Sequence, residues 1–435
     1  MYSGDVDRYY DLQMIRDNTV AVVGAGVIGA AVAYALAREG RAVLLIDRAE
    51  PGIAGASFGN AGHIASELVE PLPSWGLLFG FWRELFAFGG SLDIPLRRAP
   101  EFVPWALRFA AAARHRTDST RHLAPLVKPA VGRMARWLAE IGRPELLRTN
   151  GHLQVWFGPR SGQRAAEEGL AMERLGIPTQ GPPSEILQVI ARRSPGGREP
   201  GNNLRQKTAR AAGLWFPGTA HVLDPLKIVQ SFAGAARQRG ASFECTEVRA
   251  IEPLEGGAVL HTSSKFLTVD AVVVCTGAWA ASLLEPLGLR VPMESARGYH
   301  VEMPGHPALT DTPILYAEKR IYVSPMEGRL RATSFMEFAG YSAAPDPRKL
   351  ARLRTRLGDL GYDCPVDGPG WVGPRPVLPD YLPGIGRLEH TSVFYAVGHQ
   401  HIGLTLAPVT GELISDLVAG RQPRHDISAL DLRRF

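Results

Sequence analysis

The sequence predicts an α/β protein: a Rossmann-like dinucleotide-binding domain with an inserted α+β substrate domain built on an antiparallel sheet. Three observations predict this fold. A glycine-rich turn joins an apolar strand to a helix near the N-terminus, a second buried strand ends in a glycine turn near residue 275, and βα character returns after residue 391. At 435 residues, the chain is long enough for two or three structural units with a large core.

The N-terminal strand–turn–helix carries the most specific signal. The apolar run Val20–Val23 stops at Gly24, and Gly26 and Gly29 complete a Gly-x-Gly-x-x-Gly pattern. The first glycine permits the tight turn, the second lets backbone approach a pyrophosphate, and the third lets helix and strand pack closely. The helix N-terminus then offers free N–H groups and a positive dipole end to phosphate.

An acidic residue completes this motif. The next apolar strand, residues 42–46, ends at Asp47, about 20 residues beyond the glycines, where a carboxylate can accept hydrogen bonds from ribose hydroxyls. The alternative is a membrane helix or signal peptide over residues 20–37. That stretch contains three glycines and ends at Gly40 as an ordinary helix does, so we expect a bound dinucleotide and no membrane span here.

Composition excludes several classes of protein. The chain is 45% hydrophobic and 21% charged, and its net charge of +5 is spread without a long basic run, so nucleic acid binding is not indicated. Cys245, Cys275 and Cys364 are odd in number and far apart, as is typical of reduced thiols in a cytoplasmic protein. His399 and His401 alone make a poor ligand set, so no metal site is expected.

Residues 75–88 form a strongly apolar, aromatic segment that is too short to span a bilayer. We expect a helix that packs on the core or a lid near the substrate. A monotopic membrane contact at the inner face of the membrane is the alternative. The sequence indicates no oligomeric state.

The remaining elements follow from periodicity and from cap and turn residues. Residues 66–145 are expected to be mostly helical and residues 195–206 to form an exposed loop. Helices are expected from Asp224–Pro225 to Gly240 and over residues 410–418. Strands are expected over 151–157, 242–248, 258–262, 266–269, 270–274 and 392–397, with alternating strands over 291–337. The dinucleotide domain then comprises residues 1–65, 207–290 and 366–435, and the substrate domain residues 66–206 and 291–365.

Five further segments identify a family. They are Gly55–Gly62, Thr276–Trp279, Trp371–Asp380, Pro383–Gly386 and Gly398–Pro408. With the glycine turn, and in this order over nearly the whole chain, they resemble the D-amino-acid oxidase-like FAD-dependent oxidoreductases, and within them the bacterial D-amino-acid dehydrogenases. The resemblance implies FAD. It implies noncovalent FAD, because no cysteine lies around Arg375 and no histidine lies two residues before Asn60.

A set of cofactor contacts follows from the glycine motif and the resemblance. The backbone of Val248 is expected at the adenine, and Gly403 is expected to open a helix whose positive end faces the pyrimidine side of the flavin. The full expected set is Gly24, Gly26, Val27, Ile28, Gly29, Asp47, Arg48, Ser57, Asn60, Ala61, Gly62, Val248, Thr276, Gly277, Trp279, Gly398, His399, Ile402, Gly403, Leu404 and Thr405.

Five side chains are catalytic candidates. Arg375, in Gly-Pro-Arg-Pro, matches the family's carboxylate-binding arginine, whose planar fork binds a carboxylate bidentately; its alternative role is an ion pair with Asp380. Tyr322, in Tyr-Val-Ser-Pro, matches the tyrosine that donates to the same carboxylate; its alternative is a strand tyrosine half-buried in a sheet. The further pocket candidates are Tyr299, His63 and His401.

The resemblance implies oxidation of a D-amino acid, with cyclic ones such as D-proline or D-hydroxyproline included. Hydride would pass to flavin N5, the imine would hydrolyse to a keto acid, and electrons would pass to a quinone or another non-oxygen acceptor. Two alternatives stay open: a glycine- or sarcosine-type amine oxidase that makes hydrogen peroxide, and a non-catalytic or electron-relaying subunit of a heteromeric dehydrogenase. Arg375 and Tyr322 argue against the latter, because a dead pocket needs no carboxylate clamp.

Overall fold

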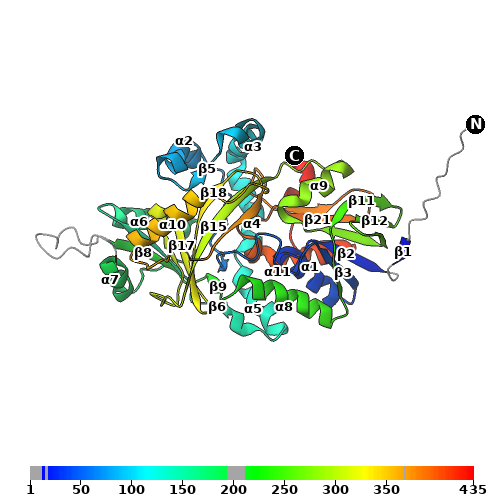
Figure 1. Ribbon diagram of the computed structural model, residues 1–435, viewed down its shortest axis with the longest axis horizontal. Helices are drawn as coiled ribbons and strands as arrows, with labels where there is room; N and C mark the ends of the chain where they lie inside the picture. Colours follow the sequence, from blue (N-terminus) through cyan, green and yellow to red (C-terminus); the bar gives the residue numbers. More distant parts are fainter. Residues whose placement is uncertain (1–11, 15–17, 194–210, 367) are drawn as a thin grey trace, which may run out of the picture.

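The computed structural model describes residues 12–14, 18–193, 211–366 and 368–435, so the loop expected over 195–206 lies outside the described residues. Two large sheets lie towards opposite ends of an elongated molecule (Figure 1). One is the mainly parallel sheet of a Rossmann-like domain and the other is a mainly antiparallel sheet. The predicted fold class is confirmed.

The Rossmann-like sheet has six strands in the order β10-β3-β2-β14-β21-β20. Five run parallel, and β20 pairs antiparallel with β21 at the edge. Their bounds are β2 (Thr19–Val23), β3 (Ala42–Asp47), β10 (Ser242–Cys245), β14 (Ala271–Val274), β20 (Gly384–Arg387) and β21 (Val393–Val397). Every residue of β2 is buried because layers cover both faces of this sheet, which explains its unbroken apolar run.

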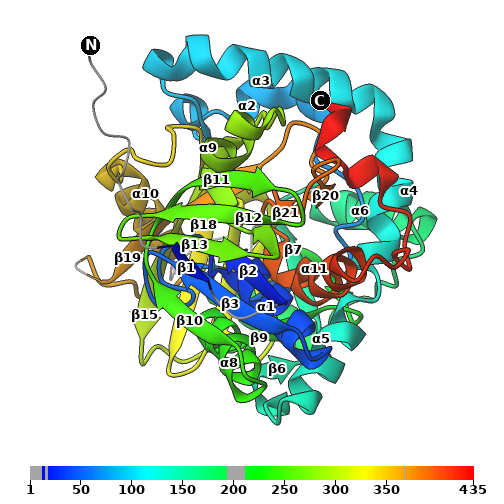
Figure 2. The same cartoon turned by 90° about the vertical axis from the view of Figure 1, so that its right-hand side faces the viewer.

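Helices cover one face of this sheet and a small sheet covers the other. The helices are α1 (Val27–Arg38), α8 (Pro225–Gln238) and α11 (Gly403–Val418), and α1 packs against both of the others (Figure 2). The small sheet contains β1 (Leu12–Met14), β11 (Val248–Leu254), β12 (Gly257–Thr262) and β13 (Phe266–Val269), with α9 (Ala280–Leu284) beside it. Alternate residues of β2 enter the two resulting cores, Val20 and Val22 on the helical side and Ala21 and Val23 on the other.

The second large sheet runs in the order β19-β15-β18-β17-β16-β7-β8, with β5 (Leu92–Asp93) paired to β18. Its strands are β7 (His152–Phe157), β8 (Ala211–Phe216), β15 (Glu294–Pro304), β16 (Ile314–Tyr316), β17 (Ile321–Met326), β18 (Arg329–Glu337) and β19 (Gly370–Val377). Helices α6 (Ser161–Arg174), α7 (Ser184–Arg193) and α10 (Pro347–Asp359) lie at this end of the molecule (Figure 1).

A three-stranded sheet and four helices make up the rest of the described fold. The sheet is β4 (His63–Ile64), β9 (Ala220–Val222) and β6 (Leu147–Arg148). The helices are α2 (Trp75–Glu84), α3 (Ala99–Ala112), α4 (Arg116–Val127) and α5 (Ala130–Glu140), as expected for a mostly helical stretch. Helix α5 packs on α11, so part of this stretch contributes to the core of the Rossmann-like domain.

Three expectations need correction. The strand expected over 242–248 is two strands, because β10 pairs with β3 whereas β11 starts in the small sheet. Strands β8 and β19, expected in the dinucleotide domain, pair with β7 and β15 of the large antiparallel sheet. Helix α2 has no buried residue, so it does not pack into the core. The last helix begins at Gly403, as expected for the cofactor contact, and includes the helix expected over 410–418.

Candidate active site

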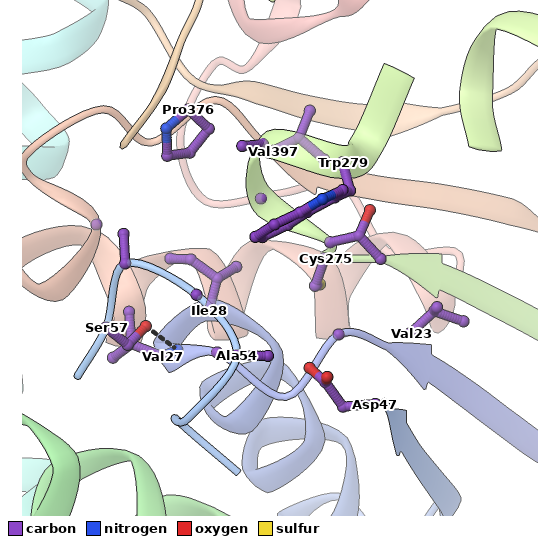
Figure 3. A pocket seen from close by; sticks show the side chains of 18 of the residues that line it. Val23, Val27, Ile28, Asp47, Ala54, Ser57, Cys275, Trp279, Pro376 and Val397 are labelled. Atoms are coloured by element: carbon purple, nitrogen blue, oxygen red, sulfur yellow. Dashed lines mark hydrogen bonds between the residues drawn. The ribbon is translucent and has the colours of Figure 1, made fainter. Parts of the chain in front are cut away.

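An open cleft lies at the carboxyl ends of β2, β3, β14 and β21. This is where an open parallel sheet binds ligands, since the connections from neighbouring strands diverge there. The glycine turn, Asp47, Ser57 and Trp279 approach the cleft from different segments (Figure 3).

Each glycine of the turn has a distinct reason to lack a side chain. Gly24 has a φ of +103°, and a Cβ there would lie 2.5 Å from the carbonyl oxygen of Cys275. A Cβ at Gly29 would lie 1.7 Å from the carbonyl oxygen of Gly24, so this glycine lets α1 pack against the turn. Gly26 faces the cleft, where backbone can approach a phosphate. The geometry agrees with the roles expected from the motif.

Asp47 joins the turn to the cleft. Its Oδ2 accepts from the backbone N–H of Ala25 at 2.6 Å and its Oδ1 from that of Ala49 at 3.2 Å. Burial raises the pKa of this carboxyl, against the effect of the Ala25 hydrogen bond. Asp47 lines the cleft, and a carboxylate has further lone pairs for ribose hydroxyls (Figure 3).

The cleft extends beyond the glycine turn and offers binding features for further parts of a long ligand. The hydroxyl of Thr276 is buried in the cleft wall and has no hydrogen-bond partner among the described residues. The guanidinium of Arg48 stacks over the ring of Trp279, 4.2 Å from its centre, at the cleft. The N-terminus of α11 opens onto the same space at Gly403. Phosphate, ribose and ring-binding features along one cleft match the donor and acceptor requirements of FAD.

Most of the expected cofactor residues line the cleft. They are Gly24, Gly26, Val27, Ile28, Asp47, Arg48, Ser57, Asn60, Val248, Thr276, Gly277, Trp279, Gly398, His399, Gly403 and Leu404. The cleft is also lined by residues that were not expected, among them Thr246, Pro376 and Gln400, which adjoin the expected motifs or lie within them.

The other expected cofactor residues support the site from behind. Gly29 packs the helix, and Ile402 is buried in the helical core. Thr405 Oγ1 accepts from the N–H of Ala65 at 2.9 Å, and the carbonyl of Ala61 accepts from Ser324 Oγ at 2.7 Å. Gly62 has a φ of +76°, and its N–H donates to the Asn60 side chain at 2.8 Å.

The loop Gly55–Gly62 is anchored by two side chains that the sequence did not reveal. Arg331 Nη1 donates to the carbonyls of Phe58 at 3.0 Å and Asn60 at 2.7 Å, while its Nη2 donates to Glu302 at 2.6 Å. His300 Nδ1 lies 3.1 Å from the carbonyl oxygen of Gly59. Nothing local in the sequence marks Arg331 or His300 for this role, because their burial and their partners come from distant segments.

Arg375, on β19, is available to bind an anion. Its Nη1 donates to the carbonyl of Phe335 at 3.1 Å, and it has no acidic partner among the described residues. Asp380, the alternative partner, pairs with Arg434 at 2.6 Å. Desolvation lowers the pKa of Arg375, so a carboxylate ligand would relieve an electrostatic cost.

Tyr322 and His63 belong to a hydrogen-bonded chain. The Tyr322 hydroxyl lies 2.8 Å from His63 Nδ1, and His63 Nε2 lies 2.7 Å from Glu67 Oε1. Burial raises the pKa of Tyr322 well above its usual value, and the nearby Glu67 charge adds to the effect. The ring of His152 lies 4.7 Å from that of His63. Glu67 was not expected from the sequence, because nothing local distinguishes it from other acidic residues.

His401 joins the two halves of the site, whereas Tyr299 does not belong to it. His401 is exposed; the Arg375 charge acts to lower its pKa and the Glu67 charge acts to raise it, so both groups lie near enough to influence the ring. Tyr299 is 1% exposed, and its hydroxyl donates to Glu337 at 2.7 Å and accepts from Arg297 at 3.0 Å. The expectation that Tyr299 lines the pocket is therefore wrong, because its hydroxyl is held in this buried ionic network.

The chain belongs to the family of FAD-dependent oxidoreductases, whose model, described as FAD dependent oxidoreductase, matches residues 19–417. It is therefore an FAD-dependent oxidoreductase, as the motifs implied. Among its curated relatives is a D-amino-acid oxidase of Bradyrhizobium diazoefficiens, 29% identical over 96% of this chain and 98% of the relative. Another is a D-amino acid dehydrogenase of Cereibacter sphaeroides, 30% identical over 96% of this chain and 95% of the relative.

Solved structures share the fold. Glycine oxidase from Geobacillus kaustophilus superposes with a TM-score of 0.71 at 24% identity, over 96% of this chain and 100% of that one. L-proline dehydrogenase from P. horikoshii gives a TM-score of 0.70 at 18% identity, over 97% and 98%. Within the described residues, no helix is both long and apolar enough to cross a membrane.

Proposed function

We propose that the protein oxidises the C–N bond of a D-amino acid, including cyclic ones such as D-proline or D-hydroxyproline, and passes the electrons to an acceptor other than oxygen. The proposal depends mainly on Arg375, a desolvated guanidinium with no acidic partner among the described residues, which lies near enough to His401 to lower the pKa of that ring. The names of relatives that match this chain over nearly its whole length support the substrate class.

The chain's own side chains would hold and orient the substrate. The planar fork of Arg375 binds the substrate carboxylate, which fixes Cα relative to the cofactor cleft. Tyr322, whose hydroxyl lies 2.8 Å from His63 Nδ1, would contact the substrate from the His63 side. FAD, when bound, accepts the hydride that leaves Cα. The imine then reacts with water to give the keto acid.

The domains divide broadly as the sequence suggests, with β8 and β19 in the substrate domain. We also propose that FAD is bound without a covalent link. Residues close to the cleft offer no attachment point of the kind expected: residue 58 is Phe, and Cys364 lies in the core of the antiparallel sheet. Cys275 lines the cleft, but its thiol is buried at the end of β14.

Helix α2 is the proposed route to a membrane-borne acceptor such as a quinone. Trp75, Phe79 and Trp82 share one face of this helix, and their exposed fractions are 49%, 80% and 50%. Arg83 follows them on the helix, and α2 lies along the upper edge of the molecule, beside α3 and β5 (Figure 1). Exposed aromatic rings beside a cationic side chain are typical of contact with a lipid surface. Loss of vesicle co-sedimentation in a Phe79→Ser, Trp82→Ser variant would support this role; unchanged co-sedimentation would refute it.

The reaction is tested with enantiomer pairs of proline, alanine and arginine, with glycine and sarcosine alongside. Keto acid or cyclic imine formation is measured with a quinone analogue and, separately, in air with peroxide detection. The proposal expects turnover of D-enantiomers with the quinone analogue and little peroxide. Peroxide equal to turnover, with preference for glycine or sarcosine, would identify the amine oxidase. Absence of turnover with every probe, in protein loaded with FAD, would favour a non-catalytic subunit.

A further inference from the structure

Arg375 and Glu67 are the arginine and the carboxylate whose charges act on His401, and His63 lies beside Glu67. Burial lowers the pKa of His152 to about 3 and that of His221 to about 4, so these two rings are neutral near pH 7. The charges that act on the titration of His401 include Arg375, which lowers its pKa, and Glu67, which raises it. An amino acid is a zwitterion, so Arg375 can balance its carboxylate and Glu67 can balance its ammonium group.

The backbone holds Glu67 in this position. The turn that carries it is fixed by the Ala65 N–H, which donates to Thr405 Oγ1 at 2.9 Å, and by Ser66 Oγ, which donates to the Gly218 carbonyl at 2.7 Å. Glu67 is 8% exposed; its Oε1 contacts His63, and its Oε2 has no hydrogen-bond partner among the described residues. Burial works to raise the pKa of Glu67, but His63 outweighs it and the pKa ends below its usual value. The carboxylate therefore stays charged.

The direction of the hydrogen bonds follows from this charge. A carboxylate only accepts, so the Nε2 of His63 must carry a proton that it donates to Glu67. When the ring carries only this proton, Nδ1 has a lone pair, and the Tyr322 hydroxyl donates to it across 2.8 Å. Because the only proton of Tyr322 is used in this way, its oxygen can accept a hydrogen bond from a substrate but cannot donate one. Tyr322 in this state suits an ammonium group rather than a carboxylate.

On the basis of the proposed amino-acid oxidation, we propose that Glu67, His63 and Tyr322 form a relay that takes a proton from the substrate ammonium group. An N–H bond of the ammonium breaks as its proton passes to the Tyr322 oxygen, and the Tyr322 hydroxyl proton passes to His63 Nδ1. The products are a neutral amine, a neutral tyrosine and an imidazolium paired with the Glu67 carboxylate. No electrons change hands. The amine lone pair is then free to assist the departure of hydride from Cα.

In this relay Tyr322 contacts the substrate, and Glu67 is a positioning residue that acts through His63. The effect of replacing Glu67 should therefore depend on whether the amino group of the substrate is protonated when it binds. At a pH above the pKa of the substrate ammonium group, the amine is already neutral and the relay is no longer needed. A purely structural role for Glu67 would not become dispensable at alkaline pH.

The test compares Glu67→Gln with Glu70→Gln in the FAD-loaded enzyme. Glu70 is the matched control, because it lies in the same segment but pairs with Arg116 at 2.7 Å. Flavin reduction by D-alanine and by D-proline is followed anaerobically near pH 7 and near pH 10. Glu67→Gln should slow reduction about 100-fold near pH 7 and recover to within about threefold of the wild type near pH 10, as loss of general base catalysis predicts. Glu70→Gln should match the wild type at both pH values.

A second variant, a substrate analogue and a metal-removal control complete the test. Tyr322→Phe should show the same alkaline recovery, and it serves if Glu67→Gln does not fold, as judged by flavin content and melting temperature. Propionate, which lacks the amino group of D-alanine, should perturb the flavin spectrum of Glu67→Gln with unchanged affinity. An equal defect at both pH values, or weakened propionate binding, would overturn the relay. So would activity lost on dialysis against EDTA and restored by zinc, since donor atoms of His63, Glu67 and His152 lie within 4.8 Å of one another. If neither amino acid reduces the wild-type flavin, the proposed function fails instead.

Discussion

Replacement of Arg375 by alanine should remove most activity while FAD stays bound. Arg375 lies on β19 and donates one hydrogen bond, to the Phe335 carbonyl, so its remaining donors are free for a substrate carboxylate. Deleting one partner of a buried, hydrogen-bonded charge pair costs roughly 2–5 kcal/mol. At about 1.4 kcal/mol per tenfold, this is a loss of roughly 30-fold to a few thousand-fold in kcat/KM.

The desolvation of Arg375 favours the upper part of that range, because a substrate carboxylate would be left without a charged partner in a water-poor site. Arg375→Lys should recover only part of the loss, because an ammonium group cannot reproduce the planar fork. The matched control is Arg387→Ala, an exposed arginine on β20.

Rapid mixing under anaerobic conditions separates substrate affinity from the rate of flavin reduction in each variant. The expected result for Arg375→Ala is a large rise in the substrate concentration needed for half-maximal reduction, with flavin content and melting temperature like those of Arg387→Ala. If Arg375→Ala reduces its flavin with near-normal substrate dependence, the carboxylate is held elsewhere and the amino-acid interpretation loses its main support.

Three further predictions concern the cofactor and the stability of the fold. Acid precipitation should release the yellow colour into the supernatant, and colour that stays in the pellet would contradict noncovalent binding. Asp47→Ala should weaken FAD binding by roughly 10-fold to 150-fold, since a hydrogen bond to a charged group contributes about 1.5–3 kcal/mol; unchanged affinity in a titration of the apoprotein would remove Asp47 from the site. Stability should fall as the pH falls from about 6.5, because the unfolded chain then binds protons that the folded protein excludes, at up to about 1.4 kcal/mol per pH unit for each buried histidine. The buried histidines whose folded pKa is lowered to about 3 or 4 include His152, His221, His300 and His399. Equal urea midpoints at pH 7.5 and pH 5.5 would contradict this account.

The parts of the fold that the sequence predicted depend on local signals. Gly24, Gly26 and Gly29 encode their roles within six residues, and the apolar run of β2 reflects burial on both faces of a parallel sheet. The helix at Pro225 begins at its predicted cap, where Asp224 accepts from the N–H groups of the first turn.

The parts that it did not predict depend on contacts between distant segments. Glu67 contacts His63, which is only four residues away in the sequence. The third member of this hydrogen-bonded series, Tyr322, comes from another sheet, so the sequence does not reveal the whole set. Tyr299 differs from a pocket residue only because Arg297, Glu337 and the Asp346 backbone surround its hydroxyl, and strand alternation cannot reveal that.

Helix α2 illustrates a different limit. Its apolar composition predicted burial, because exposure of several aromatic rings is costly for a free surface. The fold instead anchors the neighbouring residues: the Arg352 guanidinium lies 3.5 Å from the centre of the Phe86 ring, and Arg352 Nη1 donates to the Phe86 carbonyl at 2.6 Å. The helix itself is left with its aromatic face outward. An apolar composition indicates that a helix will contact other apolar groups. It does not tell whether those groups belong to the protein's own core or to another molecule.

The most direct test of the central claim is anaerobic mixing of the purified protein with the two enantiomers of proline and of alanine, followed by the loss of flavin absorbance. The account predicts that at least one D-enantiomer bleaches the flavin within the time of a turnover, and that its L-enantiomer does so far more slowly. Bleaching by L-enantiomers alone would contradict the stereochemical assignment, and a flavin that no amino acid reduces would contradict the proposed function.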